Sequence, residues 1–102
     1  MELGPSDTDG DRVVAVGEDI VVALPESPGS GYRWFPDEGT SPLSDHYEAP
    51  SPGVGGTGRR EFRFRAEHPG TLGLRLVRRR AWEDRPDAEF HVRIEVRASP
   101  RL

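Results

Sequence analysis

Hydrophobic and polar residues alternate with a period of two along most of this chain. In the segment 88–97, Phe90, Val92, Ile94 and Val96 alternate with charged or polar residues. This alternation predicts a β-strand with one buried face and one solvent-exposed face. Alternating or β-branched runs predict further strands over 12–16, 19–24, 31–35, 43–48, 59–66 and 72–76. No window of about 11 residues shows the apolar stripe of a helix.

These seven predicted strands follow one another at a spacing of about ten residues, with Gly and Pro between them. The tripeptide His68-Pro69-Gly70 predicts a tight turn, because Pro fixes one φ angle and Gly accepts a positive one. The pattern predicts an all-β immunoglobulin-like sandwich of about seven to eight strands. We expect one domain over residues 12–98, preceded by a frayed, acidic segment over residues 1–11.

Composition restricts the classes to which the chain can belong. Its 102 residues are enough for one hydrophobic core, and no apolar run approaches the roughly 18 residues of a membrane span. The absence of cysteine excludes disulfides, thiolate metal sites and a cysteine nucleophile. The opening residues resemble no secretory leader, so we expect either a cytoplasmic protein or a secreted or cell-envelope protein that has lost a leader.

Charge is distributed unevenly along the sequence. Residues 1–50 hold 2 Arg and 11 acids, whereas residues 51–102 hold 12 Arg and 7 acids. Every strongly basic residue is Arg, and Lys, Asn and Gln do not occur. This usage is typical of a GC-rich genome, and we expect a bacterial source.

Three loops between the predicted strands have unusual compositions. The first contains Ser27-Pro28-Gly29-Ser30-Gly31-Tyr32-Arg33-Trp34, the second Gly53-Val54-Gly55-Gly56, and the third Arg80-Ala81-Trp82. In a Greek-key sandwich they would follow the second, fourth and sixth strands. All three can therefore emerge at one end of the domain and form one surface.

The order and spacing of these motifs resemble the chagasin-like inhibitors of papain-family cysteine proteases. That family carries an Asn-Pro-Thr-Thr-Gly-Tyr-x-Trp loop, a Gly-x-Gly-Gly loop and an Arg-Pro-Trp loop, and the likeness extends over about residues 12–97. The resemblance implies a tight, reversible, non-covalent inhibitor without enzyme activity. Its first loop would enter the catalytic cleft near the protease thiol, and the other two loops would grip the cleft walls. The residues implied to bind the protease are Ser27, Pro28, Gly29, Ser30, Gly31, Tyr32, Gly53, Val54, Gly55, Gly56, Arg80, Ala81 and Trp82.

The chain departs from the family pattern at several of these positions. Ser27 stands where the family has Asn, Gly29 replaces a Thr, and Ser30 keeps a hydroxyl where the second Thr occurs. Ala81 replaces Pro, and we expect the third loop to keep freedom that is lost only on binding.

The residues themselves are suited to insertion into a cleft. Gly29 and Gly31 would allow the backbone to approach a partner closely, and Pro28 would stiffen the loop. Trp82 is an aromatic residue surrounded by charged residues in the sequence. Such a residue is poorly placed to belong to the core and is typical of an interface hot spot. The spacing of Tyr32 and Trp34 places both on one face of a strand, where they can also belong to the core.

Each motif also has a structural interpretation without a partner. The first loop can be a plain Gly-Pro turn, Gly53–Gly56 a flexible linker, and Trp82 a side chain folded back onto the sandwich. The chain would then be an immunoglobulin-like interaction or adhesion module. Arg78-Arg79-Arg80 could form a nucleic-acid patch, but the chain is acidic overall, and a solvated strand face fits better.

The remaining chemistry-bearing residues predict no further site. The three His residues are scattered over different elements, so we expect no metal site and no cofactor. Ser30 has no neighbouring base in the sequence that could activate it, so we expect no catalysis. The predicted partner is a papain-like cysteine protease, bound by a monomer that contacts neither nucleic acid nor membrane.

Overall fold

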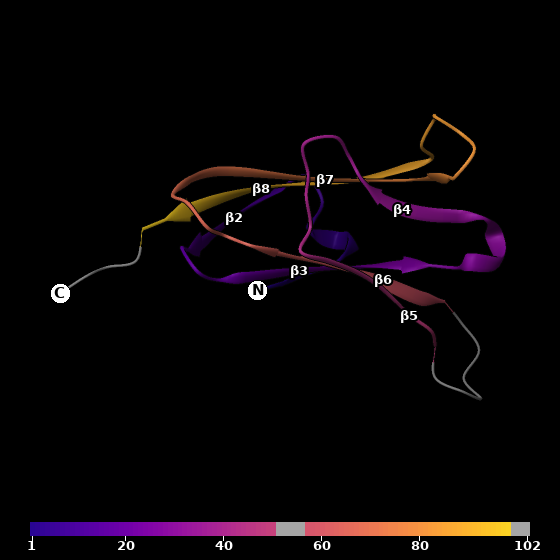
Figure 1. The fold of residues 1–102 in the computed structure, drawn as a ribbon, viewed down its shortest axis with the longest axis horizontal. Coiled ribbons are helices and arrows are strands. Elements are labelled where there is room, and N and C mark those ends of the chain that lie inside the picture. Colours follow the sequence, from indigo (N-terminus) through magenta and orange to yellow (C-terminus); the bar gives the residue numbers. More distant parts are fainter. Residues whose placement is uncertain (51–56, 99–102) are drawn as a thin grey trace.

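Two four-stranded sheets face each other and enclose one hydrophobic core (Figure 1). The computed structural model describes residues 1–50 and 57–98. One sheet has the strand order β1-β3-β6-β5 and the other β2-β8-β7-β4. The strands are β1 (Glu2–Leu3), β2 (Gly10–Ala15), β3 (Asp19–Glu26), β4 (Tyr32–Pro36), β5 (Ser44–Glu48), β6 (Gly58–Arg65), β7 (Gly70–Arg80) and β8 (Ala88–Arg97). The predicted all-β sandwich is confirmed.

Helical structure in the described residues is restricted to two short 3-10 turns. These are η1 (Pro5–Asp7) and η2 (Pro28–Ser30). No described helix is long and apolar enough to cross a membrane.

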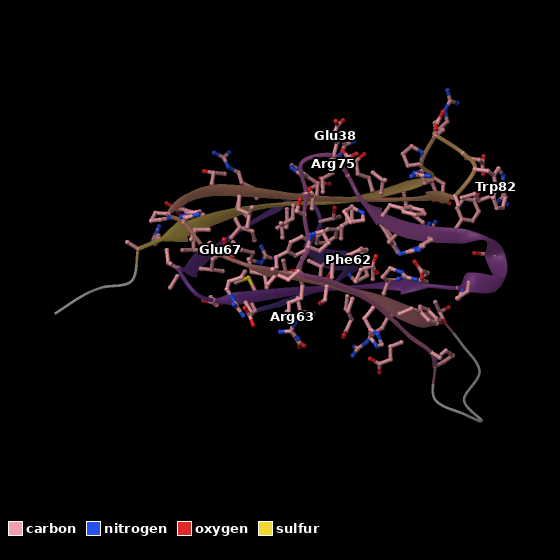
Figure 2. All side chains as sticks on the ribbon, viewed as in Figure 1. Glu38, Phe62, Arg63, Glu67, Arg75 and Trp82 are labelled. Carbon is pink, nitrogen blue, oxygen red and sulfur yellow. The ribbon has the colours of Figure 1, made fainter. Side chains whose placement is uncertain are left out.

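The core is built from the apolar residues of the alternating strands. Phe90, Val92 and Ile94 of β8 are almost fully buried, as are Phe62 of β6 and Ile20 of β3. Phe62 lies between the two layers in Figure 2. Full burial of one such side chain contributes about 1.5–3 kcal/mol, so the period-two pattern supplies most of the driving force for folding.

The β2–β3 and β6–β7 connections both depend on a glycine. Gly17, between β2 and β3, has a φ of 95°, and Gly70, after His68-Pro69, has a φ of 134°. Both angles lie in the region that glycine adopts without a steric cost. The predicted turn at 68–70 is therefore confirmed.

The N-terminal segment differs from the frayed segment that the sequence predicts. Glu2 and Leu3 form β1, which pairs in parallel with Val21 and Val22 of β3. Leu3 is only 3% exposed. Asp7 accepts a hydrogen bond from the Gly4 amide at 2.7 Å and also pairs with Arg12. A two-residue strand is too short to show any alternation, so no pattern could predict it.

Candidate functional site

The connections β3–β4 and β7–β8 lie at the same end of the sandwich, at the right in Figure 1. We call residues 27–31 the first loop, residues 81–87 the third loop, and this end of the molecule the loop end. The second-loop motif Gly53-Val54-Gly55-Gly56 lies outside the described residues. Thr57, which precedes β6, places its Oγ1 3.3 Å from the Oγ of Ser27. The start of β6 is therefore in contact with the first loop.

The first loop is a compact turn closed by its own hydrogen bonds. The amides of Ser30 and Gly31 donate to the carbonyls of Ser27 and Pro28, each at 3.0 Å. The Ser30 hydroxyl donates to the Ser27 carbonyl at 2.7 Å and accepts from the Tyr32 amide at 3.2 Å. Gly31 ends the turn with a φ of 83°. Ser30 thus stabilises the shape of the loop, while Ser27, Pro28, Gly29 and Ser30 are exposed.

Tyr32 and Trp34, which share a strand face, have different environments. Trp34 is 5% exposed and belongs to the core, and its Nε1 donates to the Pro25 carbonyl at 3.0 Å. Tyr32 is half-buried, and the guanidinium of Arg80 lies 4.4 Å from the centre of its ring. Trp34 therefore anchors the base of the first loop, and Tyr32 joins that loop to the third.

A buried ion pair supports the first loop from below, and sequence reasoning did not identify it. Glu26, at the end of β3, is 3% exposed and accepts from the Trp34 amide at 2.8 Å. Arg60 donates to both oxygens of Glu26, at 3.0 and 2.8 Å, and also pairs with Asp45 at 2.6 Å. Burial opposes the charge of Arg60, but its hydrogen bonds to Asp45 and Glu26 outweigh this and raise its pKa. Along β3 every second residue faces the core, and Glu26 follows Ile20 and Leu24 in this alternation. That alternation is the signal that could have revealed the buried carboxylate.

The third loop is closed at its base by an ion pair between Arg78 of β7 and Asp87, the last residue of the loop. Arg78 donates to both oxygens of Asp87 at 2.8 and 3.0 Å, and the Asp87 amide donates to the Arg78 carbonyl at 2.8 Å. The hydrogen bond from Arg78 holds the pKa of Asp87 below its usual value. Arg78, Arg79 and Arg80 are all half-buried. They help build the loop end, while the side chains of Arg78 and Arg80 keep 36% and 39% of their surface exposed, so the expected solvated strand face is only partly covered.

Trp82 is the most prominent apolar side chain at the loop end. It is 75% exposed, and Figure 2 places it at that end, next to the first loop. Its ring lies beside the first loop, because a Cβ built on Gly31 would lie 3.5 Å from Cη2 of Trp82. Trp82 is therefore not folded back onto the sandwich. The structure brings Ser27–Tyr32 and Arg80–Trp82 together on one surface.

Between the two loops lies an open hollow of about 410 Å³. It is lined by Pro25, Glu26, Ser27, Ser30, Tyr32, Thr57, Arg78 and Asp87. The charged groups in this lining are paired: Glu26 with Arg60, and Arg78 with Asp87. In the described part of the chain, no group of three His, Asp or Glu side chains is placed to hold a metal ion.

This surface can be compared with known proteins. The family model of the chagasin family peptidase inhibitors (I42) matches residues 13–96, and the chain belongs to this family. The family consists of inhibitors and not of enzymes. A search of curated proteins finds no match.

Solved structures of similar fold include further protease inhibitors. The cysteine protease inhibitor EhICP2 from Entamoeba histolytica is 24% identical, has a TM-score of 0.82 and is covered over 94% of each chain. Amebosin, known from a solution structure, is 27% identical with a TM-score of 0.77, over 95% of this chain and 97% of its own. PbICP-C, solved in complex with falcipain-2, is 15% identical with a TM-score of 0.58, over 97% of this chain and 90% of its own.

Proposed function

We propose that this chain is a tight, reversible, non-covalent inhibitor of papain-family cysteine endopeptidases, which it blocks by occupying the active-site cleft with its loop end. The observation that carries the proposal is that exposed Trp82 of the third loop lies beside Gly31 of the first. It makes one continuous surface from two of the three motifs. The cysteine protease inhibitors among the similar structures support the same class of target.

The first loop has the properties of a wedge that resists cleavage. A protease cleft cuts an extended backbone, whereas residues 28–30 form a 3-10 turn with internal hydrogen bonds. Apart from its chain neighbours, no atom of residues 1–50 and 57–98 lies within 4 Å of the position that a Cβ on Gly29 would take, so the backbone there is open to a partner. A preformed, rigid loop also loses little conformational entropy on binding. We therefore assign entry into the cleft to Ser27–Tyr32.

The third loop would grip one wall of the cleft with Arg80, Ala81 and Trp82. An exposed Trp next to Arg is the composition of a binding hot spot. The opposite wall is assigned to Gly53, Val54, Gly55 and Gly56, which lie outside the described residues and keep this role as a prediction.

The charge distribution supports a protein partner and not a nucleic acid. Arg59, Arg60, Arg63, Arg65 and Arg78 all pair with carboxylates. Guanidinium groups that are already paired are poorly available to phosphates. We therefore propose a monomer that binds its target protease and neither nucleic acid nor membrane.

A titration of papain with the purified chain tests this function. We expect activity to fall linearly to zero at one inhibitor per active enzyme, and to return on dilution with competing substrate. A serine endopeptidase is the specificity control and should remain active. Mass spectrometry should recover the inhibitor uncleaved. Full papain activity at a tenfold excess would reject the proposal and favour the interaction or adhesion module.

A further inference from the structure

The side chain of Arg79 spans the inner side of the third loop. Its Nη1 lies 3.3 Å from the carbonyl oxygens of Arg80 and Ala81 and 3.1 Å from that of Glu83. One guanidinium nitrogen carries two hydrogens, so the three carbonyls share its donors. The carbonyls of residues on both sides of Trp82 are therefore held toward one point.

Arg79 is itself held in place by an aromatic side chain. Its guanidinium carbon lies 4.2 Å from the ring centre of Phe35 on β4, the neighbouring strand. The guanidinium of Arg33 lies 5.1 Å from the same ring. Stacking on an aromatic ring fixes the plane of a guanidinium and stabilises it. Phe35 thus orients the donors of Arg79 toward the third loop.

The segment that Arg79 holds is a four-residue turn. The Glu83 amide donates to the Arg80 carbonyl at 3.0 Å, so Ala81 and Trp82 are its two central residues. Pro is favoured at the first central position because it fixes φ there. Ala81 lacks this restraint, yet the turn is closed in the free protein. How much freedom Ala81 leaves to this turn before binding stays a prediction.

We propose that Arg79 is a positioning residue, which holds the third loop in its binding shape by clamping the carbonyls around Trp82. Its clamp takes the place of the restraint that a Pro at position 81 would supply. The role in inhibition rests on the proposed function. The effect on the shape of the free loop does not.

The test removes the clamp and asks whether Pro restores its effect. Arg79→Met keeps an unbranched side chain of similar reach and removes all donors. Arg75→Met is the matched control, because Arg75 lies on the same face of β7 and pairs with Asp37 and Glu89, away from the loop. The inhibition constant for papain and the hydrogen-exchange rate of the Glu83 amide are measured for both variants and for Arg79→Met/Ala81→Pro.

We expect Arg79→Met to raise the inhibition constant about tenfold, since the loop must then be ordered on binding. Exchange of the Glu83 amide should become at least about fivefold faster, while Arg75→Met changes neither quantity. Ala81→Pro should recover most of both losses in the Arg79→Met background and change the parent by less than about twofold. Arg79→Lys should behave like Arg79→Met, because one ammonium cannot reproduce the stacked, forked geometry.

Two results would overturn this inference. One is unchanged Glu83 exchange in Arg79→Met, which would show that the turn does not need the clamp. The other is an equal effect of Ala81→Pro in both backgrounds, which would show that Arg79 and the turn act independently. If the parent protein fails to inhibit papain, the proposed function fails, and the exchange rates alone still decide whether Arg79 positions the loop.

Discussion

Gly31 and Trp82 lie side by side at the loop end, although 51 positions separate them in the sequence. Gly31 has a φ of 83°, and the position of its absent Cβ is 3.5 Å from Cη2 of Trp82. That distance is an ordinary van der Waals contact, so the backbone angle requires glycine here more strongly than space does. Gly31 thus ends the first loop directly beside Trp82 of the third loop.

Gly31→Val should weaken inhibition far more than its effect on folding explains. A β-branched residue at positive φ costs about 1–2 kcal/mol of stability. The added side chain also presses on Trp82, so we expect at least about tenfold weaker inhibition of papain. Inhibition constants and thermal unfolding are measured together.

Gly39→Val separates the two effects of that substitution. Gly39 has a φ of 88° and lies in the β4–β5 connection, with open space around its absent Cβ. It should lose similar stability and inhibit like the parent. Equal inhibition by the Gly31 variant and the parent would contradict the coupling of the two loops.

Trp82→Ala should weaken inhibition while the melting temperature stays within about 2 °C of the parent, because the ring is 75% exposed. Truncation of a hot-spot Trp costs about 2 kcal/mol or more, or roughly thirtyfold in the dissociation constant. Trp34→Ala is the contrast: its side chain is 5% exposed, and its loss should cost about 3–5 kcal/mol of stability. A large drop in melting temperature for Trp82→Ala would place Trp82 in the core.

Glu26→Gln should destabilise the protein by about 2 kcal/mol in denaturant unfolding. The amide can still accept from the Trp34 N–H but leaves Arg60 without its buried counter-charge. The remaining contact of Arg60 with Asp45 keeps the loss below that of a completely broken buried pair. Glu95→Gln removes the exposed partner of Arg97 and should change stability by less than about 1 kcal/mol. Equal stability of the two variants would contradict the supporting role of Glu26.

Asp87→Asn should remove part of the pH dependence of stability. The hydrogen bond from Arg78 lowers the folded-state pKa of Asp87, so its contribution is complete above the ordinary Asp pKa of about 3.9. The contribution is lost as the pH falls below that value through the folded-state pKa. The melting temperatures of parent and variant should therefore differ most near pH 7 and converge toward pH 2. A difference that stays constant with pH would show that the charge of Asp87 is not involved.

The strands could be predicted because burial selects every second residue, as Phe90 to Val96 show. The two-residue strand at Leu3 could not, since its burial depends on pairing with β3 and leaves no period in the sequence. Glu26 occupies one of the alternate positions of β3 that face the core, but a carboxylate normally marks an exposed position. Its partner Arg60 lies 34 residues away, and only the fold brings the two together.

The sequence predicted which loops form the loop end, but not which side-chain contacts hold those loops in place. Motif order placed the first and third loops on one surface. The run Arg78-Arg79-Arg80 gave no indication that these side chains contact Asp87, the turn carbonyls and Tyr32. The contribution of Gly53–Gly56 and the bacterial source remain predictions.

The most direct measurement of cleft occupation is calorimetric titration of papain with the chain, before and after the cleft is filled by a thiol-directed peptidyl inhibitor. We predict one binding site per papain molecule when the cleft is free, and no measurable heat of binding when it is filled. Papain whose thiol carries only a small alkyl group should still bind, because no covalent bond to the thiol is required. Equal affinity for filled and free papain would contradict the account, since the loop end would then bind outside the cleft.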